Sequence, residues 1–231
     1  MLEVDALNQY YGGSHTLRNV AFEAPSGAVT AILGRNGVGK TTLLQMHRRA
    51  AAGALGRHRL RRGGRHPAAA ARARRLGLGY VPQGREIFPR LTVEENLQAR
   101  PRDQAARRDH SAAHLRDVSG AWPKCWAGAA ATFPGGQQQQ LAIGRALAME
   151  PKLLVLDEPT EGIQPSIIKD IERAIRRLAA EGEMAILLVE QYYDFARSLA
   201  DRYVVLSRGE VIKAGKGADM EADGVRACLT V

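Results

Sequence analysis

The stretch GRNGVGKTT, from Gly34 to Thr42, decides the fold that the sequence predicts. It meets the pattern G-x-x-x-x-G-K-S/T and follows a short apolar run, Val29 to Leu33. A strand, such a loop and a helix, in this order, place backbone N–H groups and the positive end of the helix around the phosphates of a nucleotide. A plain glycine-rich turn before a helix is the alternative, but the context on both sides favours the phosphate-binding interpretation. The stretch therefore predicts binding of a nucleoside triphosphate.

Each residue of this loop has an expected part in binding. Lys40 is expected to reach the β- and γ-phosphates, and the hydroxyl of Thr41 is expected to be a ligand of Mg²⁺. The rest of the loop is expected to surround the nucleotide with its backbone: Gly34, Arg35, Asn36, Gly37, Val38, Gly39 and Thr42.

A second apolar run, KLLVL at residues 152–156, ends in Asp157 and Glu158. Asp157 is expected to hold Mg²⁺ through water, and Glu158 to polarise the water that attacks the γ-phosphate. Acidic pairs also end strands as solvated caps, but a phosphate-binding loop upstream favours the catalytic interpretation. These two stretches predict a nucleoside triphosphate and Mg²⁺ as cofactors, and the family resemblance described below implies that the nucleotide is ATP.

Short apolar strands alternate with amphipathic helices along most of the 231 residues, which predicts one α/β domain with a parallel sheet and crossover helices. In LTVEENL, Thr92 and Glu95 form a capping box that predicts a short helix. The expected strands are 2–7, 17–24, 29–33, 78–83, 152–156, 184–189, 203–206 and 211–214. The other expected helices begin within the glycine loop, at 135, at Pro165 and near Asp194.

The net charge of +9 belongs to one segment of the chain. Residues 24–85 hold 13 Lys or Arg and no Asp or Glu, whereas the other 20 basic residues face all 24 acidic ones. The tract 46–75, with ten Arg and three His, has neither a helical nor a strand period, so it predicts no buried face. A basic nucleic-acid tract, a solvated insert and coding sequence read out of frame are the three interpretations. Because no aromatic residue is interleaved for base stacking, we expect no nucleic-acid partner.

Two further observations concern the compartment. No apolar run approaches the roughly 18 residues that a membrane-spanning helix needs. The only cysteines, Cys125 and Cys228, lack a metal-like spacing, which favours a reducing compartment. We expect a soluble, cytoplasmic chain.

From about residue 2 to 215 the chain resembles the ATP-binding subunit of an ABC transporter. Gly34–Thr42 matches the Walker A motif of that family, and Leu153–Asp157 matches Walker B. The resemblance implies a P-loop NTPase with a RecA-like parallel sheet core and a small antiparallel β region. It also implies an ABC-type helical subdomain, at about 85–145, within a single nucleotide-binding domain that spans 1–231.

The resemblance also implies roles for residues outside the two Walker motifs. Tyr11 matches the aromatic residue that stacks on adenine, and Gln83 matches the Q-loop that senses Mg²⁺ and the membrane partner. Glu158 matches the catalytic glutamate, and Gln191 stands where most relatives place the switch histidine. The end of the signature motif LSGGQ, which contacts ATP held by the opposite subunit, is matched by Gly135, Gly136 and Gln137.

Finer features resemble the importers for branched-chain amino acids and amides, such as GREIFPRLTVEENL and the Gln in LVEQ. NQYYGGSHTL, EGIQPSI and EQYYDFA are most similar to the second ATPase subunit of the urea importer. This implies a peripheral protein at the cytoplasmic face of the bacterial inner membrane. The implied partners are two transmembrane permeases, an identical or homologous ATPase subunit and, indirectly, a periplasmic substrate-binding protein.

The sequence departs from the family at two places. Residues 46–75 neither finish the first helix nor supply the small β region, and the signature reads TFPGGQ instead of a form such as DLSGGQ. Pro134 removes a hydroxyl and an N–H expected at the γ-phosphate, so an ATP-binding but hydrolysis-deficient protein is the alternative function. Codons for Asp-Leu-Ser read one nucleotide late give Thr-Phe-Pro. We therefore hypothesise out-of-frame windows at about 46–76 and 100–134, which translation of the other reading frames would test.

Overall fold

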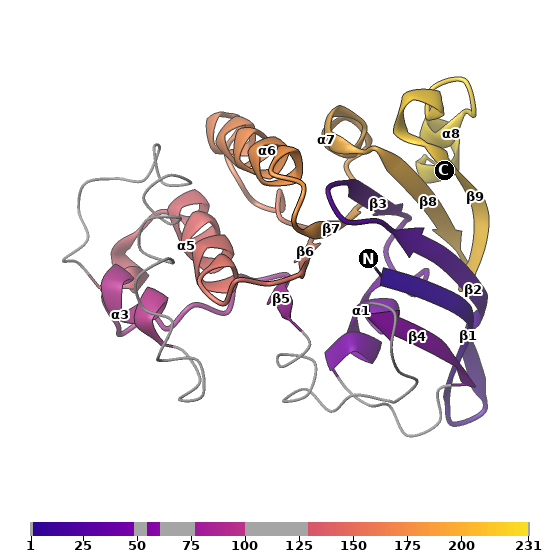
Figure 1. Cartoon of the computed structure of the whole chain (residues 1–231), viewed down its shortest axis with the longest axis horizontal. Helices are drawn as coiled ribbons and strands as arrows, with labels where there is room; N and C mark the ends of the chain where they lie inside the picture. The colour runs from indigo at the N-terminus through magenta and orange to yellow at the C-terminus, as the bar shows by residue number, and fades with distance from the viewer. Residues whose placement is uncertain (1, 49–54, 61–76, 100–128, 231) are drawn as a thin grey trace.

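Two β-sheets organise the chain in the computed structural model, which describes residues 2–48, 55–60, 77–99 and 129–230 (Figure 1). The larger sheet has six strands in the order β5-β6-β7-β3-β8-β9, and the smaller has three in the order β2-β1-β4. The strands are β1 (Leu2–Tyr11), β2 (Ser14–Ala24), β3 (Val29–Leu33), β4 (Leu55–Leu60), β5 (Leu78–Val81), β6 (Leu153–Asp157), β7 (Ala185–Glu190), β8 (Arg202–Ser207) and β9 (Glu210–Lys216).

The larger sheet is parallel from β5 to β8, and β9 is added antiparallel at one edge. Every residue of β3, β6 and β7 is buried, because these central strands are covered on both faces. Strand β7 lies between β3, which leads into the glycine loop, and β6, which ends at Asp157. The predicted parallel α/β sheet is confirmed.

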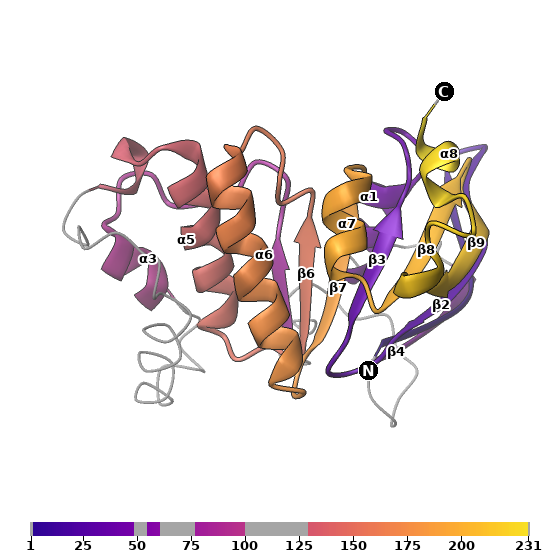
Figure 2. The ribbon, with the colours of Figure 1, turned by 90° about the horizontal axis from the view of Figure 1, so that it is seen from above.

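The helices lie on both faces of the larger sheet (Figure 2): α5, α6 and α7 pack on one face, and α1 packs with the small sheet on the other. Their bounds are α1 (Lys40–Arg48), α3 (Val93–Gln98), α5 (Gly135–Leu147), α6 (Pro165–Ala180), α7 (Tyr193–Leu199) and α8 (Val225–Leu229), with short 3₁₀ turns at Ala130–Thr132 and Gly217–Asp219. None of the helices in the described ranges is both long enough and apolar enough to cross a membrane.

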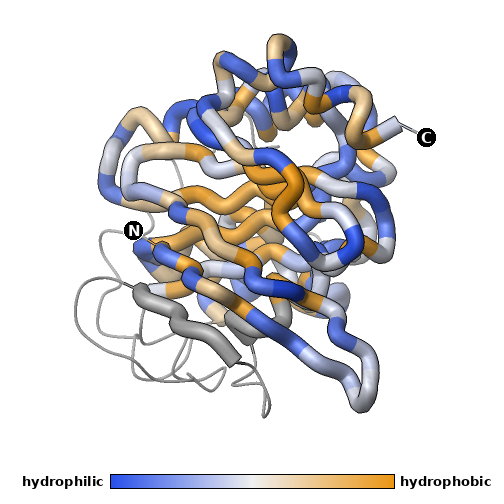
Figure 3. The backbone as a smooth tube through the Cα atoms, turned by 90° about the vertical axis from the view of Figure 1, so that its right-hand side faces the viewer, coloured by the Kyte–Doolittle hydropathy of each residue, from blue (hydrophilic) through white to orange (hydrophobic). Residues whose placement is uncertain are grey.

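Alternate residues of the central strands supply two separate cores. In β6, Val155 joins a core with Leu43 and Leu44 of α1 and with the small sheet. Its neighbours in the strand point the other way, into a core formed with α5, α6 and α7. The apolar residues of the strands run orange through the middle of the molecule, with blue polar segments at the outside (Figure 3).

Local sequence signals for the helices agree with the structure. Pro165 occupies the first turn of α6, and the buried face of that helix is formed by Ile171, Ile175 and Leu178. At α3, the Thr92 hydroxyl accepts from the Glu95 amide at 3.2 Å and the Glu95 carboxylate accepts from the Thr92 amide at 2.8 Å. The predicted capping box is therefore present.

The small antiparallel sheet corrects one expectation. Residues 46–75 were expected neither to finish the first helix nor to supply a strand, but α1 runs to Arg48 and residues 55–60 form β4, paired with β1. Because β4 is an edge strand held by backbone hydrogen bonds, it needs no apolar alternation of its own. Residues 49–54, 61–76 and 100–128 lie outside the described part, so the reading-frame hypothesis stays a prediction.

Candidate active site

The glycine loop lies between the end of β3 and the start of α1, at the carboxyl edge of the parallel sheet. Gly39 has a φ of +110°, a conformation that side-chain-bearing residues rarely adopt, and a Cβ there would lie 2.8 Å from Leu17 Cδ2. A Cβ on Gly34 would lie 2.8 Å from the carbonyl oxygen of Leu206. Two of the pattern's glycines are thus required by the backbone path and by its close neighbours.

Lys40 is buried in this loop and is fully engaged by oxygen atoms. Its ammonium donates to the carbonyl oxygens of Gly34 at 2.6 Å and Arg35 at 3.2 Å. It also pairs with Glu158 Oε1 at 3.0 Å, and the two side chains are only 5% and 7% exposed. A phosphate group that binds Lys40 must therefore compete with the Glu158 carboxylate for the same ammonium.

Glu158 follows β6 in a left-handed backbone conformation, with a φ of +46°. Its amide donates to the Val189 carbonyl at 2.9 Å, and Gln191 Nε2 donates to its Oε2 at 3.4 Å. Such strained backbone persists only where surrounding contacts hold it, and it is common at functional sites. The structure therefore brings three predicted catalytic residues, Lys40, Glu158 and Gln191, into one contact group.

Asp157, the last residue of β6, is also buried, at 4% exposed. Burial is the largest influence and raises the pKa of its carboxyl, whereas hydrogen bonds from Tyr80 and from the Gln83 backbone and the charge of Lys40 lower it. Tyr80 Oη donates to Asp157 Oδ2 at 2.9 Å. A cation beside this carboxylate would further favour its charged form.

The chemistry of these donors fits Mg²⁺. Asp157 supplies a carboxylate beside Lys40, and Thr41 is exposed in the first turn of α1. Within the described ranges, no group of three or more His, Cys, Asp or Glu side chains could hold a metal ion alone. Mg²⁺ is usually bound by one or two protein oxygens together with water and substrate phosphates, so this small donor set suits it.

Other predicted site residues lie at the margin of the group. The Gln83 side chain donates to Glu161 at 2.8 Å, and so points toward the turn after β6. Tyr11 ends β1 and is 51% exposed. The exposed residues of the glycine loop include Arg35, Asn36 and Gly37.

The signature residues Gly135 to Gln137 are not brought to the glycine loop of the same chain. They form the first turn of α5, which lies on the far side of α6 from α1 (Figures 1 and 2). Pro134 is the N-cap of this helix and makes no side-chain cap hydrogen bond.

Sequence reasoning missed two polar residues that contact the site. Tyr80 binds Asp157, and Glu190 at the end of β7 is 1% exposed and accepts hydrogen bonds from Thr160. A signal for Glu190 was available, because AILLV followed by Glu repeats the pattern of an apolar strand that ends in a carboxylate. Tyr80 carried no such signal, since its partner belongs to a distant strand.

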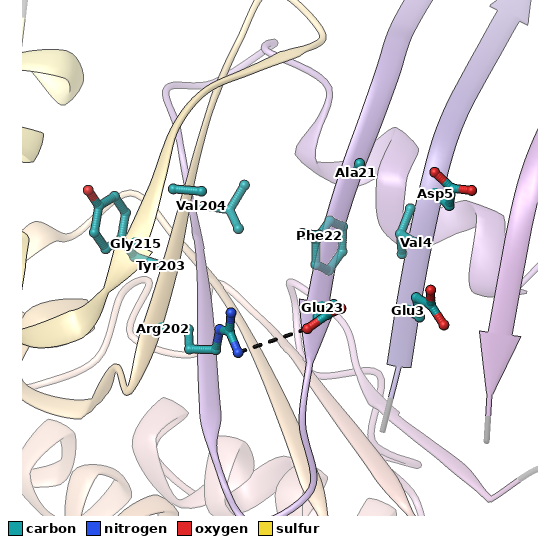
Figure 4. Close-up of a pocket in the computed structure, with 11 residues that line it drawn as sticks. Glu3, Val4, Asp5, Ala21, Phe22, Glu23, Arg202, Tyr203, Val204 and Gly215 are labelled. Atoms are coloured by element: carbon teal, nitrogen blue, oxygen red, sulfur yellow. Dashed lines mark ion pairs between the residues drawn. The ribbon is translucent and has the colours of Figure 1, made fainter. Parts of the chain in front are cut away.

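A cavity of about 450 Å³ lies elsewhere, between the small sheet and strands β8 and β9 (Figure 4). Its described lining includes Glu3, Asp5, Glu23 and Arg202, and no residue of the glycine loop. Arg202 and Glu23 form an ion pair at 4.0 Å across it. Because none of its lining residues belongs to the glycine loop, this cavity is not the candidate site.

The comparison with known proteins agrees with the geometry of the glycine loop and of the two carboxylates, Asp157 and Glu158. A family model described as ABC transporter matches residues 17–161. The chain is 37% identical over 221 residues to the high-affinity branched-chain amino acid transport ATP-binding protein BraG of Pseudomonas aeruginosa, with 94% of each chain covered. It is 33% identical over 224 residues to the Fe(3+) ions import ATP-binding protein FbpC of Pseudomonas fluorescens, covering 93% of this chain and 61% of that protein.

Solved structures agree with this assignment. The structure of cbiO1 from Clostridium perfringens, part of the ABC transporter complex cbiONQ, has a TM-score of 0.82 at 26% identity, with 96% of this chain and 91% of that chain covered. A dimeric ATP-binding cassette in a post-hydrolysis state bound to ADP and Pi has a TM-score of 0.76 at 22% identity, with 94% of this chain and 98% of that chain covered. At this identity it shows the shared fold alone. The chain belongs to the ABC transporter family, and it is the ATP-binding ATPase subunit of an importer.

Proposed function

We propose that this subunit hydrolyses ATP to drive import of urea, or of branched-chain amino acids or short amides. The observation that carries the hydrolysis is the contact group of Lys40, Glu158 and Gln191 beside the buried Asp157. The urea assignment is supported by the stretches NQYYGGSHTL, EGIQPSI and EQYYDFA. The similarity to BraG supports the wider branched-chain amino acid group.

The residues divide the chemistry between binding and water activation. Backbone amides of the loop and the Lys40 ammonium bind the β- and γ-phosphates, while Tyr11 stacks on the adenine. Glu158 accepts a hydrogen bond from the attacking water. Gln191 orients the Glu158 carboxylate through the hydrogen bond from its side-chain amide. Asp157, Thr41 and Gln83 would hold Mg²⁺, whose charge neutralises the phosphates during transfer.

The position of the signature residues supports a head-to-tail dimer. Gly135 to Gln137 lie away from the loop of their own chain, so they complete the site of a second, identical or homologous ATPase subunit. Closure of this dimer on ATP and its opening after hydrolysis would move two permeases at the cytoplasmic face of the membrane. A periplasmic substrate-binding protein would deliver the solute to the permeases.

Reconstitution tests the substrate. The chain, its partner ATPase and the permeases are placed in liposomes with the binding protein and MgATP, and uptake of radiolabelled urea, acetamide and leucine is measured. We expect ATP-dependent uptake of urea that exceeds uptake of leucine and that is lost with Glu158→Gln. Uptake of leucine alone would contradict the urea assignment but support the branched-chain one. Uptake of none of the three would contradict both.

Pro134→Ser is expected to raise ATP turnover. The serine restores a hydroxyl and an N–H at the start of α5, and one hydrogen bond to a charged phosphate corresponds to a gain of about tenfold. Pro134→Ala, which restores only the N–H, is the matched control and should gain less. Both variants are compared with the original chain by phosphate release at saturating ATP. Equal turnover in all three would show that the altered signature does not limit hydrolysis.

A further inference from the structure

Glu190 is a buried carboxylate that the proposed chemistry leaves without a role. Glu190 is the last residue of β7, the strand between β3, which leads into the glycine loop, and β6, which ends at Asp157. The residue is only 1% exposed. The preceding residues of β7 are apolar, AILLV. A charged group in such a place loses its hydration, and this loss is tolerated only where the protein supplies hydrogen bonds.

The two oxygens of this carboxylate bind two different turns. Oε1 accepts from the Thr160 hydroxyl at 2.7 Å and from the Thr160 amide at 3.3 Å. Oε2 accepts from the amides of Gln191 at 3.1 Å and Tyr192 at 3.2 Å. Burial is the largest influence and raises the pKa of Glu190, while these hydrogen bonds oppose it. All four groups around the carboxylate, three amides and one hydroxyl, donate to it, so a group that only accepts hydrogen bonds suits this position best.

The two turns that Glu190 joins carry the two groups proposed to act on the attacking water. Thr160 follows two residues after Glu158, whose left-handed backbone needs support from its surroundings. Gln191 begins the other turn, and its side chain reaches the Glu158 carboxylate at 3.4 Å. The separation of Glu158 and Gln191 therefore depends on how firmly the turn after β6 is tied to the turn after β7.

We propose that Glu190 is a positioning residue for ATP hydrolysis. Its carboxylate ties the Thr160 turn to the Gln191 turn by hydrogen bonds, a link that we call the tie, and so fixes the position of Gln191 relative to Glu158. The inference rests on the proposed hydrolytic function. Small displacements of a catalytic group cost large factors in rate, because they remove the alignment of the reacting atoms. Nucleotide binding, which depends on the glycine loop, does not depend on this tie.

Glu190→Gln tests the tie at constant side-chain volume. Whichever way the amide is turned, its NH₂ faces N–H or O–H donors on one side, so one of the two turns is released. In the full chain we expect the turnover number to fall by about 10- to 100-fold, with the KM for ATP changed less than about twofold. Glu210→Gln, an exposed carboxylate on β9 paired with Arg18, is the matched control.

The Thr160 side of the tie has its own pair of variants. Thr160→Val is isosteric but lacks the hydroxyl that donates at 2.7 Å, and it should reproduce part of the loss. Thr160→Ser keeps the hydroxyl and should restore turnover. In Glu190→Gln/Gln191→Ala, turnover should be no lower than in the worse single variant, because both changes remove the same contact between Gln191 and Glu158.

Amide hydrogen exchange, measured by NMR without added nucleotide, supplies a readout independent of turnover. In Glu190→Gln the amides of the released turn, either Thr160 or the pair Gln191 and Tyr192, should exchange faster, while the Ile186 amide, bonded to the Ala28 carbonyl, should not. Uniformly faster exchange, or a rise in KM matching the fall in turnover, would reduce Glu190 to a fold-stabilising residue and overturn the proposal. Original turnover with unchanged exchange would also overturn it. If the original chain hydrolyses no ATP in any assembly, the proposed function fails, and localised exchange then decides the tie alone.

Discussion

Glu158→Gln is expected to lower the ATP turnover number by about 10²- to 10⁴-fold, the range that a general base contributes, while ATP remains bound. The amide keeps the shape of the side chain but cannot accept a proton from water. It also weakens the pairing with the Lys40 ammonium, which lies 3.0 Å from Glu158 Oε1 and must be shared with the phosphates. ATP should therefore bind the variant at least as tightly as the original chain.

Two measurements separate these effects. Phosphate release at saturating MgATP reports turnover, and titration with a fluorescent ATP analogue reports affinity. Glu172→Gln on α6, a carboxylate paired with Arg176 outside the site, is the matched control and should leave both unchanged. Turnover within tenfold of the original, or clearly weaker ATP binding, would show that Glu158 does not have the proposed role.

Lys40→Ala is expected to weaken ATP binding by about 100-fold, because charge-assisted hydrogen bonds to phosphate contribute about 1.5–3 kcal/mol each. The same change leaves Glu158 as a buried carboxylate without its ion-pair partner. Breaking one side of a buried pair costs about 3–5 kcal/mol, so the melting temperature should also fall.

The two consequences of this change are separable with one further variant. In Lys40→Ala/Glu158→Gln the buried charge is gone, so stability should recover in part while ATP affinity stays low. Lys169→Ala, at an exposed position of α6, is the control for loss of a lysine. Affinity is measured by nucleotide titration and stability by thermal unfolding. Equal stability of the single and the double variant would contradict the coupling between Lys40 and Glu158.

Most of the parallel sheet could be predicted because its signals are local. The runs at 29–33, 152–156 and 184–189 are short and continuously apolar, and all three are central strands. The capping box at Thr92 and the proline at the start of α6 mark helix starts by their own chemistry. Strand β4 could not be found in this way, since its place depends on pairing with β1 and not on a pattern in residues 55–60.

The candidate site divides along the same line. The residues Lys40, Asp157 and Glu158 belong to motifs whose residue types and spacing indicate a specific chemistry, and the structure places these residues together. Tyr80 and Glu190 were not predicted. Tyr80 acts on a residue of another strand, and Glu190 carried a local signal as a carboxylate at a strand end, but its partner Thr160 lies in the turn after β6. The hydrogen bond from Tyr80 to Asp157 joins residues 77 positions apart, and the one from Thr160 to Glu190 joins residues 30 apart.

The sequence by itself determined that this chain has a phosphate-binding loop, a strand ending in two carboxylates and an alternating α/β architecture. Spacing and side-chain period along one segment suffice for these features, because they depend on neighbours in the chain. Only the tertiary structure decided the strand order, which inserts β7 between β6 and β3 and so places Glu190 between the two turns of the site. Strand order depends on which buried faces pack against each other across the whole domain, and no local pattern records that choice.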